Sequence, residues 1–364
     1  METFPLHTIG LDEAMKKQFQ LVDCVTQNFK GSEILTRGDL GVVQGLNQPV
    51  TTHKVEKVLK DFFSAESAML VRGAGTMAIR LSLHAASKKY GKTVLVHDAP
   101  VYPTTQTSMD MLGLKKVVAD FNQLDSIAQA INEQDIQLAI VQFTRQKPSD
   151  SYDPEAVIKK IKALKKEIIV ITDDNYSALK VPKIGTECGA DLSCFSTFKL
   201  LGPEGVGCII GNADLLSDLR EENYSGGLQV QGFEAISVLQ GLIYAPVALA
   251  VSSQVSSEVE SRLNAGEVSG VKQAFIANAQ SKVIIVELEK PIAAQVLVQA
   301  EALGAAPNPV GAESKYEFVP MFYRLSGTFR AANPDSVKTM IRINPMRAGA
   351  QTIIRIIKEA IERS

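Results

Sequence analysis

Between residues 68 and 211, short apolar runs alternate with helical patterns, and this alternation constrains the fold of the 364-residue chain more than any other feature. Nearly continuous apolar runs of about four or five residues are typical of strands that are covered on both faces. Strands that alternate with helices predict a mostly parallel α/β sheet, whose ligands bind beyond the carboxyl ends of the strands. The runs are 68–71, 93–96, 138–141, 168–171 and 206–210, and helical patterns include 75–89, 102–111 and 153–166.

The length of the chain predicts two domains rather than one core, because domains usually hold about 100–200 residues. A long helical pattern over 230–263 has no strand-like alternation and suits a connector between domains. We therefore predict an N-terminal arm over residues 1–45, a large domain with its connector helix over 46–263, and a smaller C-terminal α+β domain over 264–364.

Charge and composition argue against several classes of partner. Thirty-eight basic and forty acidic residues give a formal net charge of -2, so no basic field for nucleic acid or an anionic membrane is predicted. No signal-peptide pattern or apolar stretch of membrane-spanning length is recognised. The four cysteines fit no zinc spacing, and no carboxylate–histidine cluster predicts a metal site. We expect a cytoplasmic protein without a metal.

Lys199 follows a β-rich run and enters a loop with glycines at 202, 205 and 207. Lysine is costly to bury without a partner or a function, and glycine lets a backbone approach a ligand closely. An amine held in this way can form a Schiff base with a carbonyl group. The alternative is a surface lysine in an ordinary turn.

Polar and aromatic residues also follow the first two apolar runs. Gly73-Ala-Gly75-Thr76 precedes a helical pattern and would expose backbone N–H groups that suit a phosphate, or it is only a tight turn. Tyr102 could stack on a flat heteroaromatic ligand, or it is a loop aromatic. Arg145, after the run 138–141, is either a ligand-binding residue or a solvated surface arginine.

Two adjacent carboxylates, Asp173 and Asp174, follow the run 168–171. Like charges at a strand end repel each other and need a positive partner, which a protonated pyridine nitrogen would supply. The alternative is that one of them caps the next segment.

Taken in order, Gly-Ala-Gly-Thr, an aromatic residue, Asp-x-Asn-Tyr and then Ser-x-x-Lys resemble the fold-type-I enzymes that depend on pyridoxal 5′-phosphate (PLP). The segment 196–205 resembles the lysine loop of class V aminotransferases, cysteine desulfurases and selenocysteine synthase. Gly-Asp-Leu-Gly at 38–41 and the stretches 97–105 and 172–176 resemble the YhfS group of bacterial PLP-dependent proteins most closely. The resemblance implies a fold-type-I PLP-dependent transferase with a mostly parallel central sheet.

The resemblance implies a role for each matching residue. Lys199 would form the Schiff base with the cofactor and then move a proton at the substrate α-carbon. Asp173, rather than Asp174, would pair with the pyridinium nitrogen, and Tyr102 would stack on the ring and complete the catalytic set. The full set of residues implied to bind the cofactor is Gly75, Thr76, Tyr102, Asp173, Tyr176, Ser196, Lys199, Gly226 and Gly227.

Two arginines and one glycine pair complete the implied site. Arg342, in an Ile-Arg-Ile strand pattern, would bind the substrate α-carboxylate, and Arg145 is a second substrate-binding candidate. Gly226 and Gly227 resemble the segment that reaches the phosphate of a neighbouring subunit. The resemblance therefore implies a homodimer with sites at its interface.

Transamination of an amino acid or amine is the leading expectation for the reaction. A PLP-dependent lyase or a β-replacement enzyme like selenocysteine synthase is the alternative, and a non-catalytic PLP-binding protein is an alternative of another class. A nucleotide-binding dehydrogenase is disfavoured because Ala78 stands at the third glycine position of GxGxxG. Desulfurase activity is disfavoured because Phe198, and not histidine, precedes Lys199 and no cysteine lies in a suitable exposed loop.

Overall fold

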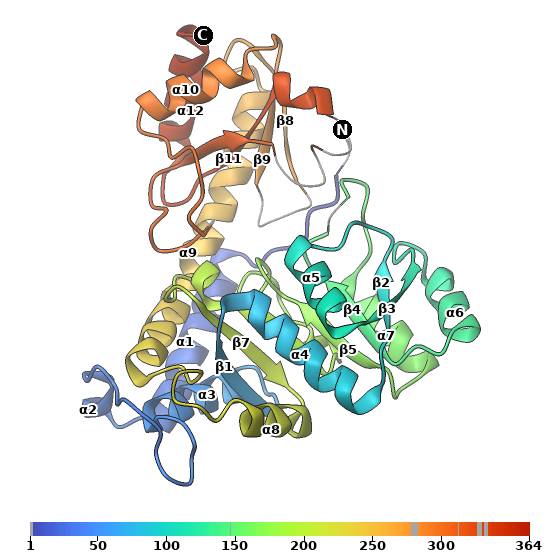
Figure 1. Cartoon of the computed structure of the whole chain (residues 1–364). Helices are drawn as coiled ribbons and strands as arrows, with labels where there is room; N and C mark the ends of the chain where they lie inside the picture. Colours follow the sequence, from blue (N-terminus) through green and yellow to red (C-terminus); the bar gives the residue numbers. More distant parts are fainter. Residues whose placement is uncertain (1–2, 146, 278–282, 312, 326–329, 331–333) are drawn as a thin grey trace. The chain divides into compact units, whose positions relative to one another are not determined.

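A computed structural model of the chain describes residues 3–364 except 146, 278–282, 312, 326–329 and 331–333 (Figure 1). It contains two compact units. The larger unit comprises residues 12–143 and 152–246, and the C-terminal unit comprises residues 1–11, 144–151 and 247–364. The units divide inside the long helix α9 (Gly232–Asn264), whereas the predicted domains divide at its end.

The larger unit is built on a seven-stranded sheet in the order β1-β7-β6-β5-β4-β2-β3. Strands β2 to β6 pair in parallel, and β7 pairs antiparallel with both β1 and β6. This mixed but mostly parallel sheet confirms the predicted fold class. The strands are β1 (Ser67–Arg72), β2 (Thr93–His97), β3 (Lys115–Ala119), β4 (Leu138–Gln142), β5 (Ile169–Asp173), β6 (Leu192–Ser196) and β7 (Val206–Gly211).

Helices cover the sheet, with α4 against β6 and β7 and α3 against β1 and β7. Helix α7 begins where the Asp153 carboxylate accepts hydrogen bonds from two backbone N–H groups and Pro154 follows at the first helical position. The helices are α1 (Leu11–Asn28), α2 (Gly31–Ile34), α3 (Val50–Phe62), α4 (Ala74–Tyr90), α5 (Pro103–Leu112), α6 (Leu124–Glu133), α7 (Pro154–Leu164) and α8 (Ala213–Glu222).

Part of the segment expected to be an arm is the helix α1. Its side chains Ala14, Leu21, Cys24 and Val25 are buried, at positions that recur with the helical period. The arm expected over residues 1–45 is thus helical along much of its length and buries one face.

The C-terminal unit contains a second, antiparallel sheet in the order β10-β11-β9-β8. Buried isoleucines of α12 and apolar residues of α10 form a core with this sheet. This α+β architecture agrees with the fold class predicted for the C-terminal part. Its elements are β8 (Val271–Ile276), β9 (Ile284–Leu288), α10 (Ala293–Ala302), β10 (Met321–Arg324), β11 (Met340–Asn344) and α12 (Ala350–Glu362).

Helix α9 contains 33 residues and an 18-residue window with a mean hydropathy of 1.8. Among the described residues it is the one helix long and apolar enough to cross a membrane by length and composition. The window is 61% buried within the protein, and the core helix of a soluble protein passes the same test, so this is weak evidence for a membrane span.

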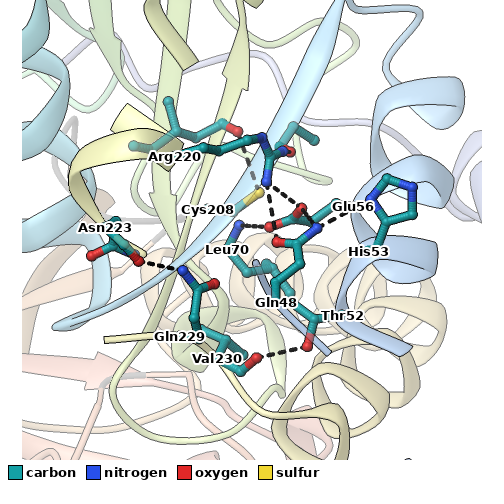
Figure 2. A network of polar contacts seen from close by, with 12 residues as sticks. Gln48, Thr52, His53, Glu56, Leu70, Cys208, Arg220, Asn223, Gln229 and Val230 are labelled. Atoms are coloured by element: carbon teal, nitrogen blue, oxygen red, sulfur yellow. Dashed lines mark hydrogen bonds and ion pairs between the residues drawn. The ribbon is translucent and has the colours of Figure 1, made fainter. Parts of the chain in front are cut away.

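A buried carboxylate ties three elements of the larger unit together (Figure 2). Glu56 of α3 accepts hydrogen bonds from the Leu70 N–H of β1 at 2.8 Å and from Arg220 of α8 at 2.7 Å. Gln48 donates to the same carboxylate at 3.1 Å and also bonds His53 at 3.1 Å. Because a buried charge is costly unless it is paired and hydrogen-bonded, this network specifies how α3 and α8 flank β1.

Candidate active site

The parallel strands β5 and β6 end side by side, and their last residues are Asp173 and Ser196. The buried Asp173 carboxylate accepts two hydrogen bonds at Oδ1, from the Asn175 backbone N–H at 3.1 Å and from Asn175 Nδ2 at 2.7 Å. Its second oxygen, Oδ2, accepts no hydrogen bond from the described part of the chain. Burial raises the pKa of Asp173, while the Asn175 bond and the nearby Lys199 charge oppose that rise.

Asp174 lies in a different environment from its neighbour. Its carboxylate accepts hydrogen bonds from the Gly185 N–H at 3.0 Å and from the Thr172 hydroxyl. Burial raises the pKa of Asp174 to about 7. Both of its oxygens therefore accept hydrogen bonds, one from Thr172 of β5 and one from Gly185 of the following loop, and Asp173 is the carboxylate with an oxygen left to offer a ligand.

Lys199 lies in a short 3₁₀ helix (Thr197–Leu200) directly after β6. Its Nζ atom is 3.8 Å from the centre of the Tyr176 ring, a cation–π distance. Tyr176 itself has φ 65°, a left-handed conformation that is strained for a tyrosine. After the lysine, the Gly202 N–H donates to the Thr197 carbonyl at 2.9 Å, and a Cβ atom at Gly202 would lie only 2.8 Å from that oxygen. Glycine is thus required for the close turn that holds the lysine.

The start of α4 packs against the glycines that follow Lys199. Gly73, with φ 99°, and Ala74 donate their N–H groups to the Gly205 carbonyl at 2.7 and 2.9 Å. A Cβ atom at Gly207 would lie 2.2 Å from the Ala74 carbonyl oxygen, so only glycine permits this approach. The predicted phosphate turn and the predicted lysine loop are therefore in direct contact.

Gly75 and Thr76 lie in the first turn of α4, where N–H groups have no partner within the helix. These two N–H groups donate to no acceptor in the described part of the chain. A Cβ atom at Gly75 would lie 2.6 Å from Asn175 Oδ1, which places this turn beside the β5 end. Thr76 Oγ1 is 3.1 Å from Thr104 Oγ1 of α5, and the exposed Tyr102 immediately precedes that helix.

The structure thus brings together seven of the predicted residues, all in the larger unit. They are Gly75, Thr76, Tyr102, Asp173, Tyr176, Ser196 and Lys199. Sequence reasoning assigned no role to Asn175, although a side-chain amide directly after a strand end was a signal for it. Asn175 contacts the segments of three of these seven residues.

The roles of all the predicted site residues stay predictions, including those of Gly226, Gly227, Arg342 and Arg145. Gly226 and Gly227 lie in an exposed loop after α8, and Gly226 lies beside Val42 of the N-terminal segment. Arg342 is buried on the interior strand β11, 4.6 Å from the centre of the Tyr323 ring. Arg145 is buried and donates to the Phe4 carbonyl. Both arginines belong to the C-terminal unit.

The donor set of the larger unit fits PLP. The N–H groups and hydroxyls at the start of α4 suit a phosphate dianion, as helix N-termini do. The buried carboxylate of Asp173 suits a protonated ring nitrogen, and the amine of Lys199 suits an aldehyde. A mostly parallel sheet with these groups at its carboxyl edge defines the class of fold-type-I PLP-dependent proteins.

Within that class, the chain belongs to the aminotransferase class V family, which matches residues 50–241, and the YhfS-like C-terminal domain family matches residues 257–357. The protein YhfS of Escherichia coli strain K12 is 54% identical over 361 residues, which cover 99% of each chain. The chain is therefore a member of the YhfS group, as the sequence motifs indicated.

Solved structures agree with this assignment. The crystal structure of the PLP-dependent protein YhfS from Escherichia coli has a TM-score of 0.97 at 53% identity, covering 100% of this chain and 99% of that one. A methionine gamma lyase from Micromonospora echinospora has a TM-score of 0.73 at 16% identity, with 95% and 98% covered. Cystathionine gamma synthase from Xanthomonas oryzae pv. oryzae has a TM-score of 0.71 at 16% identity, with 95% and 98% covered. At such low identity, the last two show the fold alone.

Proposed function

We propose that this chain, a PLP-dependent enzyme, transfers the amino group of an amino acid or amine. The predicted cofactor is confirmed by the family and by the full-length PLP-dependent relative. The observation that carries the proposal is the position of Lys199, with its amine 3.8 Å from the Tyr176 ring, after the strand next to the one that ends in Asp173. The match to aminotransferase class V over residues 50–241 supports transamination as the reaction.

When bound, PLP supplies an aldehyde for the substrate amine and an aromatic ring that accepts electrons. The residues of this chain would then hold and orient it. The Gly75 and Thr76 N–H groups and the hydroxyls of Thr76 and Ser196 would bind the phosphate. Asp173 Oδ2 would keep the ring nitrogen protonated, which maintains the ring as an electron acceptor.

Lys199 has two proposed tasks. Its Nζ atom would attach the cofactor covalently and, once a substrate amine has displaced it, would remove a proton from the substrate α-carbon and return it elsewhere. Tyr176 restricts where the amine can lie because its ring covers one side of Nζ. Arg342 is proposed to bind the substrate carboxylate, with Arg145 as a second candidate.

Elimination at the β- or γ-carbon is the second candidate reaction. Its support is the fold likeness to lyases and synthases that act on sulfur amino acids, over 95% of the chain. Both reactions begin with removal of the same α-proton, so the same roles of Lys199 and Asp173 apply to both.

A cysteine desulfurase is a poor fit to the described residues. Burial raises the pKa of all four cysteine thiols, to about 12 for Cys188, so each is held as the unreactive thiol.

We also propose a reducing, cytoplasmic location, with which four unpaired cysteines agree.

An amino-acid panel tests the reaction. The PLP-loaded protein is mixed with each amino acid, the visible spectrum is followed, and keto acid is measured with and without a keto-acid acceptor. Transamination predicts one equivalent of keto acid without acceptor and turnover with it. Turnover without an acceptor would instead establish elimination.

The covalent attachment is tested separately. Borohydride reduction followed by peptide mass analysis should find the cofactor on Lys199, and Lys199→Ala should lose both the adduct and the visible band. An adduct on another lysine would contradict the assignment.

A further inference from the structure

Asn175 connects three segments that contain predicted cofactor-binding residues. Its Nδ2 atom donates to Asp173 Oδ1 at 2.7 Å, and its Oδ1 atom accepts the Ser196 N–H at 2.9 Å. A Cβ atom at Gly75 would lie 2.6 Å from the same Oδ1 atom. One amide therefore contacts the phosphate turn, the β5 end and the start of the lysine loop.

The network fixes the direction of this amide. The backbone N–H of Ser196 can only donate, so the oxygen of the Asn175 amide faces it. The NH₂ group then faces the Asp173 carboxylate, which can accept. The reversed amide would place two donors together on one side and two acceptors together on the other.

We propose that Asn175 is a positioning residue for the cofactor ring. By binding Oδ1 of Asp173 it fixes the plane of the carboxylate and leaves Oδ2 for the ring nitrogen. By accepting the Ser196 N–H it keeps the start of the lysine loop in register with that carboxylate. This inference rests on the proposed function, because it concerns how the chain holds PLP.

Charge gives the amide a second effect. Burial favours the neutral form of Asp173, and the donated hydrogen bond from Asn175 favours its anion. Only the anion can stabilise a proton on the ring nitrogen. An aspartate at position 175 has nearly the same shape and would still accept the Ser196 N–H. Its second oxygen would replace the NH₂ group and repel the Asp173 carboxylate.

A matched control exists on the surface of the same unit. Asn122 bonds Asp120 Oδ1 through its backbone N–H at 3.0 Å and its Nδ2 at 2.8 Å, and its Oδ1 accepts the Tyr152 N–H at 3.1 Å. The arrangement repeats that of Asn175, but Asn122 is exposed and follows β3, the edge strand of the sheet, three strands from β5 in the sheet order.

The experiment compares Asn175→Ala and Asn175→Asp with Asn122→Ala and Asn122→Asp. Purified apoprotein is titrated with PLP to obtain Kd, and the visible band of the loaded protein is titrated with pH. Both Asn175 variants are expected to weaken PLP binding by about tenfold or more, since a hydrogen bond to a charged group is lost. In Asn175→Asp the added negative charge should raise the pH midpoint of the band by about one unit. The Asn122 variants should match the wild type.

The outcomes distinguish failure of the positioning role from failure of the proposed function. If wild-type protein binds no PLP, the proposed function fails. If it binds PLP and the Asn175 variants match the Asn122 variants, the positioning role is wrong. Weaker binding of Asn175→Asp with an unchanged pH midpoint would also overturn it, because a merely structural role predicts that result. Where Asn175→Ala does not fold, Asn175→Asp decides alone, since it keeps the side-chain shape.

Discussion

The carboxyl groups of Asp173, the last residue of β5, and of the adjacent Asp174 are both buried but differ in their hydrogen bonds. Asp173 has one engaged oxygen and one without a described partner, whereas both oxygens of Asp174 bind the Thr172–Gly185 region. The repulsion between two neighbouring carboxylates is relieved when one of them is protonated. Burial raises the pKa of both groups, to about 7 for Asp174, while the Asn175 hydrogen bond and the Lys199 charge oppose the rise at Asp173.

Asp174 gives a prediction for the pH dependence of folding. Its pKa is about 7 in the folded protein and near 3.8 when exposed, so the folded state binds the extra proton between these values. The stability that the protonated group contributes is complete below about pH 4 and is lost as the pH rises through 7. The unfolding free energy of Asp174→Asn should therefore depend less on pH. Relative to wild type, the variant should gain on the order of 3 kcal/mol of stability between pH 4 and 8.

Urea denaturation at several pH values measures this difference. Asp125→Asn is the control, because the Asp125 side chain is fully exposed, and it should reproduce the wild-type slope. Equal pH slopes for Asp174→Asn and wild type would contradict the assignment of this titration to Asp174.

At the scale of elements, the start of α4 depends on strand β7. Gly207→Ala should displace the Gly73–Gly75 turn, because the new Cβ would lie 2.2 Å from the Ala74 carbonyl oxygen and cannot avoid the backbone. We expect a loss of about 1–3 kcal/mol in stability and a weaker affinity for PLP. Thermal unfolding measures the stability, and PLP titration measures the affinity.

Gly10→Ala is the control, because a Cβ atom there would have nothing within 4 Å, and it should change neither stability nor PLP affinity. A Gly207→Ala variant with wild-type stability and affinity would contradict the predicted clash.

The Glu56–Arg220 pair gives a second prediction at this scale (Figure 2). The Glu56 side chain is only 4% exposed, so Arg220→Met should leave a buried, unpaired charge and cost roughly 3 kcal/mol of unfolding free energy. Adding Glu56→Gln should recover part of that loss because it removes the charge. Lys88→Ala, which breaks a pair whose lysine is 67% exposed, should cost less than about 1 kcal/mol. Chemical denaturation compares them, and similar losses for both single variants would contradict the burial argument.

At the scale of the whole molecule, we propose a homodimer that uses the exposed apolar side chains of the larger unit. Leu40 is 72% and Tyr224 67% exposed, and their two segments are joined by the Gly41 N–H, which donates to Gln231 at 2.7 Å. Large exposed apolar side chains that gather in one region are typical of interaction surfaces. The same loop carries Gly226 and Gly227, which resemble a segment that reaches a neighbouring subunit.

Light scattering after size exclusion tests the dimer. Wild type should have twice the mass of its 39.4 kDa chain, and Leu40→Glu combined with Tyr224→Glu should shift it toward the monomer. Val298→Glu, which changes an exposed side chain of α10, should leave the mass of the dimer unchanged. A monomeric wild type would refute the proposal.

The order of motifs along the chain identified the cofactor through its resemblance to fold-type-I PLP enzymes. That the motifs lie at one sheet edge was predicted separately, because each of them follows an apolar strand. The edge strand β3, with Lys115 and Lys116 exposed, was not predicted, since an exposed strand has no apolar run. Helix α1 was not predicted either, although its buried side chains recur with the helical period.

The sequence by itself determined the fold class, the family and the cofactor, since these depend on local patterns and on their order along the chain. Only the tertiary structure decided which of two adjacent carboxylates keeps an oxygen for a ligand, and that Asn175 links three segments that are separate in the chain. These properties depend on burial and on hydrogen bonds between residues such as Asn175 and Ser196, whose distance in the chain carries no information about their distance in space.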